Sequence, residues 1–243
     1  MRLTRVYIDA PLAPDVVTEL TSQAARHVSR VLRMRVGDTL HLFDDSGRSF
    51  RAEIVMINRD CVRVLPRQVV TEEPEPRLHI TLVQGISRGQ HMDYTIQKAV
   101  ELGVMRIVPV MTTFSNVRLD EQRAEKRLEH WRNIIINACE QCGRNRLPVI
   151  ESPVTLDEWL PRENREQKLL LDPAAELPLR GLTPSGNRLS LLTGPEGGLS
   201  DAEMEQARSS GFQSVRLGPR ILRTETAAVA AITACQVMWG DMD

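Results

Sequence analysis

The chain of 243 residues has few cysteines, few aromatic side chains and no long apolar run. Its four cysteines are too few for a disulfide scaffold of this size, so we expect a protein of the reducing cytoplasm. No apolar run approaches the roughly 18 residues that a membrane-spanning helix needs, and residues 1–15 lack the apolar stretch of a secretory signal. These absences exclude an integral membrane protein and argue against a secreted one.

Basic residues are unevenly distributed, although the net charge of −1 excludes a uniformly basic nucleic-acid binder. Residues 1–71 contain 11 arginines against 8 acidic residues, a net of +3, and residues 118–146 carry a net of +2. Residues 151–176 carry a net of −4. Of the 31 basic residues 28 are arginines, which suit bidentate phosphate contacts, although GC-rich genomes also favour arginine. The aromatic content of 4% argues against RNA recognition by stacked aromatic rings.

The hydrophobic pattern divides the chain into two domains joined by a linker. Two prolines and four charges without apolar periodicity indicate a linker at Val70–Arg77, and we place the domains at residues 1–71 and 78–243 with 72–77 between them. One short helical piece is expected near Ala24–Leu32. Short alternating stretches predict that the first domain is a small β-barrel; they are Thr39–Asp45, Ser49–Ile57 and Cys61–Pro66.

The second domain has the pattern of an α/β fold. Ser200 and Glu203 predict a capping box at the start of one helix. Residues 226–240 carry no charge and predict a helix buried nearly all round, either in a core or against a partner subunit. Five short apolar runs, most of them separated by helical stretches, predict a mostly parallel sheet; they are Leu78–Ile86, Arg106–Thr112, Lys168–Asp172, Leu189–Gly194 and Ser214–Gly218.

Two loops that contain Gly-Pro are the strongest ligand-binding signals. The chain has neither the GxxxxGK[ST] motif of P-loop NTPases nor a GxGxxG fingerprint after the first strand of the second domain. Instead, Leu191–Glu203 leaves a strand through Gly-Pro and opens a helix, and Leu217–Ala228 does the same, with Thr224 as the expected N-cap. In an open α/β sheet these loops should lie together. Their backbone amides and apolar side chains favour a neutral or zwitterionic ligand with an adenine and a ribose over a triphosphate.

The pair Cys139 and Cys142 has the spacing of a metal or redox motif. A zinc site needs a second pair of ligands, which the sequence does not supply nearby. A thioredoxin-like pair opens a helix, whereas this pair ends one. We therefore expect these cysteines to pack, and we expect no metal site. The five histidines form no hydrolase motif; they are His27, His41, His79, His91 and His130.

Four segments carry a resemblance to a known family by their order and spacing: Gln84–Val104, Asn137–Pro148, Leu191–Glu203 and Leu217–Ala228. With these, and with Val28–Asp38, the chain resembles the RsmE family, the 16S rRNA (uracil(1498)-N(3))-methyltransferases of the SPOUT class. The resemblance covers essentially the whole chain. It implies a PUA-like β-barrel, an α/β methyltransferase domain with a deep trefoil knot, S-adenosylmethionine (SAM) as cofactor, a homodimer, and 16S rRNA of the small ribosomal subunit as substrate.

The loops and the resemblance together assign the expected site residues. The cofactor is expected at Leu171, Thr193, Gly194, Pro195, Gly197, Leu217, Gly218, Ile221 and Leu222. The reacting uridine and its phosphates are expected at Arg88, Glu140, Arg144, Asn145, Arg223 and Glu225. Further RNA phosphates are expected at Arg30, Arg33 and Arg35 of the first domain.

Methylation at N3 of uracil requires a base for the N3 proton, and a carboxylate suits this role. Glu140, Glu225 and Glu101 all remain candidates. Because the uncharged helix begins beside Arg223, we expect a dimer interface next to the cofactor loop, with Arg144 and Asn145 supplied by the other chain. Two alternatives stay open: a non-catalytic RNA-binding module, and a SPOUT methyltransferase that acts on tRNA.

Overall fold

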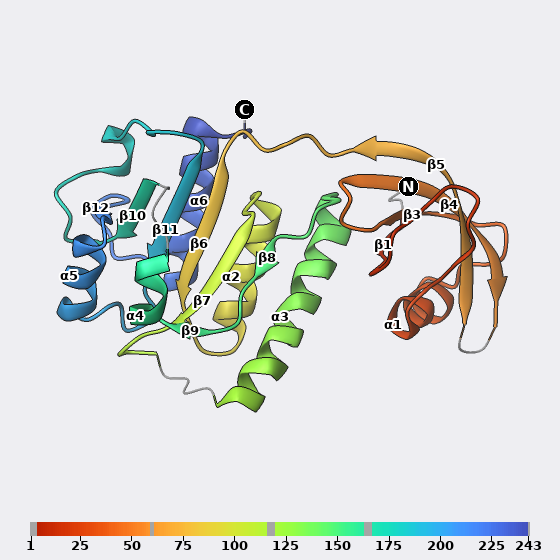
Figure 1. Ribbon diagram of the computed structural model, residues 1–243, viewed down its shortest axis with the longest axis horizontal. Helices are drawn as coiled ribbons and strands as arrows, with labels where there is room; N and C mark the ends of the chain where they lie inside the picture. Colours follow the sequence, from red (N-terminus) through yellow and green to blue (C-terminus); the bar gives the residue numbers. More distant parts are fainter. Residues whose placement is uncertain (1–3, 59–60, 116–119, 163–166, 243) are drawn as a thin grey trace. The chain divides into compact units, whose positions relative to one another are not determined.

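The computed structural model describes residues 4–58, 61–115, 120–162 and 167–242, which form two compact units (Figure 1). The first unit comprises the chain up to Glu75 together with Cys139–Leu147, and the second comprises Pro76–Ala138 and the chain from Pro148 onward. The division after Glu75 falls within the expected linker. The segment 139–147 was expected in the second domain but packs with the first, because its hydrogen bonds are made there.

The first unit is built on a five-stranded sheet. Its strands are β1 (Arg5–Tyr7), β2 (Thr18–Glu19), β3 (Thr39–Phe43), β4 (Arg48–Ile57) and β5 (Val62–Glu72), in the order β1-β3-β4-β5-β2. Only β1 and β3 pair in parallel; the other pairs are antiparallel. Leu40, Leu42 and Phe50 are fully buried in its core, as the alternating pattern requires. The helical piece is also confirmed, as α1 (Ser22–Arg26) followed by a π-helical turn, η1 (His27–Val31).

The second unit is an α/β layer structure around a parallel sheet in the order β12-β10-β11-β6-β7-β8, with β9 beside β7. All five predicted strands are present. The elements in chain order are β6 (His79–Gly85), α2 (Gln90–Glu101), β7 (Arg106–Met111), α3 (Glu121–Cys142), which continues into the first unit, β8 (Val149–Ile150), β9 (Val154–Thr155), α4 (Leu156–Trp159), η2 (Leu160–Arg162), β10 (Gln167–Leu171), η3 (Leu179–Gly181), β11 (Arg188–Thr193), α5 (Asp201–Ser209), β12 (Gln213–Val215) and α6 (Thr224–Trp239).

Helices cover both faces of this sheet. In Figure 1, α2 and α6 lie behind the sheet, where α6 packs on β6 and β11 and against α2, and α4 lies in front of it. The front layer buries Trp159 and Phe212 against Val83, Leu170 and Leu192 of the strands. Because apolar side chains leave the central strands on both faces, these strands read as continuous apolar runs in the sequence. None of the helices in the described ranges is long and apolar enough to cross a membrane.

Helix starts agree with the sequence at one position and differ at another. The predicted capping box at Ser200 and Glu203 opens α5. The expectation that Thr224 is the N-cap of α6 is wrong: Arg223 is the N-cap, and Thr224 is the first helical residue. The Thr224 hydroxyl donates instead to the carbonyl oxygen of Gly194, at 2.6 Å. The prediction that the helix is buried nearly all round is confirmed for one face only, at Ala228, Ala231, Ile232 and Cys235. The opposite side is half-buried, and Val237 near the end of the helix is 61% exposed.

Candidate functional site

A cavity of about 540 Å³ opens at the carboxyl edge of the parallel sheet. The loops after β10, β11 and β12 line it, together with the first residues of α6 and His91 of α2. The carboxyl ends of parallel strands meet at one edge, which is where open α/β sheets bind their ligands. The volume lies within the roughly 300–1,000 Å³ typical of small-molecule sites.

The cavity gathers every residue that the sequence assigned to the cofactor. The nine are Leu171, Thr193, Gly194, Pro195, Gly197, Leu217, Gly218, Ile221 and Leu222. Arg223 and Glu225, expected at the uridine, also line it. His91, Asp172 and Arg220 line it too, and sequence reasoning missed them. Asp172 ends a predicted strand and Arg220 lies inside a predicted loop, so their place in the cavity could have been predicted. Nothing in the sequence indicated that His91 would lie there.

The backbone of the first loop is closely packed on itself. A Cβ on Gly194 would lie 2.7 Å from the carbonyl carbon of Gly198 and 3.0 Å from the amide nitrogen of Leu199. Gly198 has φ +73° and closes a turn by donating its N–H to the carbonyl of Pro195, at 2.9 Å. Gly218 in the second loop has φ +117° with no atom within 4 Å of an added Cβ. The first loop therefore needs glycine for space, and the second needs it for backbone conformation.

Charged groups around the cavity nearly balance. Asp172, Glu196 and Glu225 oppose Arg220 and Arg223, with His91 as a further titratable group. Nδ1 of His91 lies 3.2 Å from Oε1 of Glu225, whose side chain is 14% exposed. Asp172 is engaged elsewhere, by Arg208 at 3.2 Å and by the N–H of Ala174 at 2.9 Å. This balance suits a ligand that carries charges of both signs.

Arg88, expected at the uridine, lies beside this loop on the chain between β6 and α2. Its backbone N–H donates to Oε1 of Glu196, at 2.8 Å, and its side chain is exposed. The loop after β6 is thereby hydrogen-bonded to the loop after β11.

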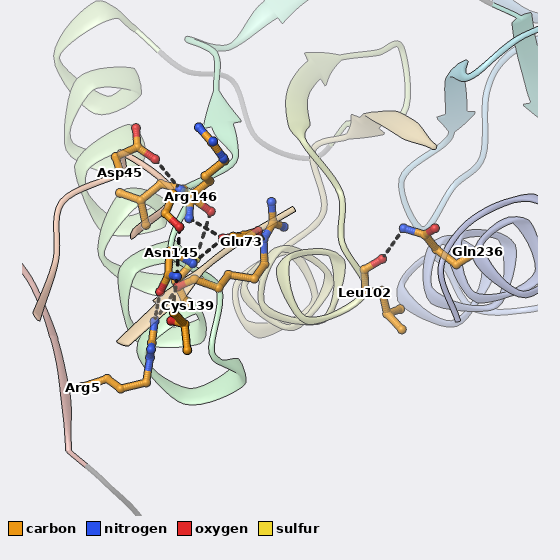
Figure 2. A network of polar contacts seen from close by, with 12 residues as sticks. Arg5, Asp45, Glu73, Leu102, Cys139, Asn145, Arg146 and Gln236 are labelled. Carbon is orange, nitrogen blue, oxygen red and sulfur yellow. Dashed lines mark hydrogen bonds and ion pairs between the residues drawn. The ribbon is translucent and has the colours of Figure 1, made fainter. Parts of the chain in front are cut away.

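Glu140, Arg144 and Asn145 lie in the first unit, where Asn145 is the centre of a polar network (Figure 2). Asn145 is 2% exposed, and its side-chain oxygen accepts from Nη2 of Arg5 at 2.7 Å. Its Nδ2 donates to the carbonyl of Gly47 at 3.1 Å and to Oγ1 of Thr71 at 3.2 Å. Oε2 of Glu73 accepts the backbone N–H groups of Asn145 and Arg146. These bonds hold the segment 139–147 on the sheet and use both ends of the Asn145 amide.

The three candidate bases lie in different surroundings. The Glu140 carboxylate accepts the N–H of Tyr7 at 3.1 Å, and burial raises the pKa of Glu140. Glu101 is paired with Nζ of Lys98, at 2.8 Å. Of the three, Glu225 is the one that lines the cavity.

The two cysteines of the CxxC motif also differ from each other. Cys139 is buried, its thiol lies 3.8 Å from the carbonyl of Arg146, and burial raises its pKa to about 12. Cys142 is exposed. Within the described residues, no three His, Cys, Asp or Glu side chains gather as a metal site.

Arg30, Arg33 and Arg35 are exposed on the first unit, on and just after η1. Arg33 has φ +53°, an uncommon conformation for a residue with a side chain. Val31 and Val36 beside them are 67% and 60% exposed. This segment presents basic and apolar side chains together.

Known proteins resemble the chain over its whole length. The family described as an RNA methyltransferase domain matches residues 73–236, and the RNA methyltransferase PUA domain matches residues 20–65. Ribosomal RNA small subunit methyltransferase E of Buchnera aphidicola from Schizaphis graminum is 38% identical over 99% of this chain and 98% of that protein. The chain belongs to the ribosomal RNA small subunit methyltransferase E family. It is thus an RNA methyltransferase with a PUA-like domain and a parallel-sheet methyltransferase domain.

Two solved structures resemble this methyltransferase E family member closely. A methyltransferase of Legionella pneumophila, solved with bound SAM, is 39% identical with a TM-score of 0.96 and full coverage of both chains. Ribosomal RNA small subunit methyltransferase E of Neisseria gonorrhoeae, bound to S-adenosyl methionine, is 38% identical with a TM-score of 0.92, also with full coverage.

Proposed function

We propose that this chain transfers a methyl group from SAM to N3 of a uridine in 16S rRNA, the position that the RsmE family name numbers 1498. The observation that carries the proposal is the cavity at the carboxyl edge of the sheet, which gathers all nine residues expected at the cofactor. The two SAM-bound relatives, similar over their full length, support the same cofactor.

The cavity fits SAM in size, polarity and charge. In the turn at 194–198, Gly194, Gly197 and Gly198 have no Cβ atom, which allows a ligand to approach the backbone closely. Three carboxylates against two guanidinium groups suit a zwitterion with a positive sulfur better than a triphosphate. When bound there, SAM supplies an electrophilic methyl group. The apolar part of the lining, which suits an adenine ring, includes Leu171, Leu217, Ile221 and Leu222.

Glu225 is placed to take the proton from N3 of uracil. It lines the cavity in the first turn of α6, and a carboxylate in reach of N3 can act as a general base. His91 contacts this carboxylate at 3.2 Å and orients it. Glu225 would hold the proton when the N3–H bond breaks, and the N3 electron pair would form the bond to the methyl group as the carbon–sulfur bond of bound SAM breaks, with that bond's electron pair staying on the sulfur of the departing thioether. Arg223, the N-cap of α6, supplies a positive charge for the oxygen atoms O2 and O4 of the uracil anion.

The first unit supplies RNA affinity in this proposal. Arg30, Arg33 and Arg35 are exposed, and an arginine side chain contacts phosphate regardless of base sequence. Arg33, on the segment that follows η1, has a left-handed backbone conformation and is exposed. The match to an RNA methyltransferase PUA domain over residues 20–65 supports the same role.

A homodimer completes the proposal. Val237 and Met238 are 61% and 38% exposed at the end of α6, Met242 is 38% exposed just after it, and Ile221 is 86% exposed just before the helix begins. An isologous pairing along the length of α6 would cover the exposed side chains at both of its ends in each chain. To test a shared site, a Gly194→Val subunit is mixed with an Arg144→Ala subunit. Partial recovery of activity is expected, and no recovery in a verified heterodimer would mean that each chain builds its site alone.

The proposed activity is tested with purified protein, SAM and small-subunit rRNA. Calorimetry should detect SAM binding, and mass spectrometry of the digested RNA should find N3-methyluridine only when SAM is present. Absence of SAM binding would favour the non-catalytic RNA-binding alternative. Methylation of tRNA in place of rRNA would reassign the substrate.

A further inference from the structure

A buried relay of hydrogen bonds joins the two cofactor loops, and it begins at Gln84. Gln84 is the penultimate residue of β6 and is fully buried. In the sheet it lies opposite Thr193, the residue before Gly194. Its Nε2 donates to Oγ1 of Thr224 at 3.0 Å, and the Thr224 hydroxyl donates in turn to the carbonyl oxygen of Gly194 at 2.6 Å. One side chain of β6 thus bonds to the start of α6 and, through it, to the first loop.

The protons of this relay have one consistent arrangement. The Thr224 hydroxyl has a single hydrogen, which Gly194 receives, so the hydroxyl accepts from Gln84 through a lone pair. The second hydrogen of Nε2 goes to the carbonyl of Gly85 at 2.9 Å, and the Gly194 carbonyl lies 3.5 Å from the same nitrogen. Nε2 therefore faces acceptors only. A neutral group with two N–H donors is required, and glutamine has the length to supply it.

The relay connects the two loops that line the cavity. Gly194 begins the first loop and Thr224 ends the second, and both line the cavity. Gly85, the residue after Gln84, also contributes to this arrangement. Because it has no Cβ, Pro195 of the first loop can pack directly against it; an added Cβ would overlap the ring and backbone nitrogen of Pro195. Gln84 is not among the described residues that line the cavity, so its effect on a ligand must pass through Gly194 and Thr224.

We propose that Gln84 is a positioning residue that fixes the two cofactor loops in their binding arrangement before SAM arrives. The inference rests on the proposed SAM-dependent activity. When a loop is already ordered, ligand binding does not include the entropic cost of ordering it, so the binding free energy is more favourable. Loss of the relay should therefore raise the KM for SAM more than it lowers kcat.

The chain offers a matched control in Gln236 of α6 (Figure 2). Gln236 is 1% exposed, and its Nε2 donates to the carbonyl of Leu102 at 2.9 Å. In both glutamines the side-chain oxygen lacks a hydrogen-bond partner among the described residues. Gln236 stands 12 residues after Thr224 on the helix, about 18 Å along its axis. Substitution there removes the same kind of buried bond away from the cofactor loops.

The experiment compares Gln84→Met, Gln84→Glu and Gln236→Met with the wild-type protein. Thermal unfolding, SAM binding by calorimetry, and the KM and kcat of methylation are measured for each. Both methionine variants should lose thermal stability. Only Gln84→Met should bind SAM about tenfold more weakly, as expected when one or two buried hydrogen bonds are lost.

The Gln84→Glu variant adds a second measurement, the pH dependence of SAM affinity, which a purely structural role of Gln84 would leave unchanged. An ionised carboxylate in place of the amide has no hydrogen to donate to the oxygens of Gly85, Gly194 and Thr224, and it repels them. A protonated carboxyl group, by contrast, can donate to the Thr224 oxygen. Burial raises the pKa of such a carboxyl group. The SAM affinity of this variant should therefore improve as the pH falls from 8 to 6. The wild type carries the same charged and titratable groups around the cavity, so its pH profile is subtracted; these groups are Asp172, Glu196, Arg220, Arg223, Glu225 and His91.

The outcomes separate this inference from the proposed function. If the wild type neither binds nor uses SAM, the proposed function fails. If the wild type binds SAM and Gln84→Met matches it in Kd and KM, the positioning role is refuted while the function stands. Equal loss of SAM affinity in Gln84→Met and Gln236→Met would also refute it, because the effect would then be general destabilisation.

Discussion

The sharpest structural prediction concerns one added methyl group at Gly194. In Gly194→Ala the new Cβ would lie 2.7 Å from the carbonyl carbon of Gly198, 3.0 Å from its Cα and 3.0 Å from the amide nitrogen of Leu199. All three atoms are backbone, so no side chain can turn away, and the 194–198 turn must open. Overpacking of this kind costs about 1–3 kcal/mol, which corresponds to about 5- to 150-fold in affinity if the turn must close again to bind SAM.

Calorimetric titration with SAM measures this effect directly, with Gly186→Ala as the control. Gly186 belongs to the same unit, and an added Cβ there meets no atom within 4 Å. The control should bind SAM as the wild type does, and Gly194→Val should lose more affinity than Gly194→Ala. Gly194→Ala with wild-type affinity and wild-type melting temperature would refute the reasoning, because the turn would then tolerate the methyl group without moving.

Four further predictions concern other parts of the chain. Glu225→Gln should retain SAM binding but lose at least about tenfold in single-turnover methylation, as removal of a general base does. Alanine at Arg33 and Arg35 should weaken RNA binding and reduce the slope of log K against log salt by about 2, measured by fluorescence titration. Burial raises the pKa of Glu203, but hydrogen bonds from Ser200 and Thr113 lower it by more. The carboxylate therefore stabilises the fold above pH ~4.5, so that Glu203→Gln should lower the melting temperature at pH 7 and lose that effect as the pH falls towards 3. At pH 8 an alkylating reagent followed by mass spectrometry should label Cys142 before Cys139, because Cys142 is exposed and burial raises the pKa of Cys139 to about 12.

The strands and the cofactor loops were predictable because both leave local signals. Continuous apolar runs report strands buried on two faces, and each of the five in the second unit is present. Glycine and proline after such runs report loops at the carboxyl edge, and topology brings these loops together without further information. The trefoil knot implied by the family resemblance stays a prediction, because strand order does not by itself describe how a loop is threaded.

The remaining features depend on contacts between distant residues, which a local pattern does not encode. Thr224 has the side chain of an N-cap, yet its hydroxyl bonds to Gly194, 30 residues earlier. Asn145 reads as a candidate RNA contact within a basic segment, but its amide bonds to Gly47 and Thr71 and holds 139–147 in the first unit. Gln84 lies inside an apolar run, and nothing in the sequence marks its donors as the link between two loops.

The most direct test of the central claim is nucleoside analysis of small-subunit rRNA by mass spectrometry. Cells that lack this protein are compared with the same cells carrying the wild type or the Gly194→Val variant. N3-methyluridine should be absent without the protein, return with the wild type and stay absent with the variant. An unchanged level of N3-methyluridine in cells that lack the protein would contradict the proposed activity.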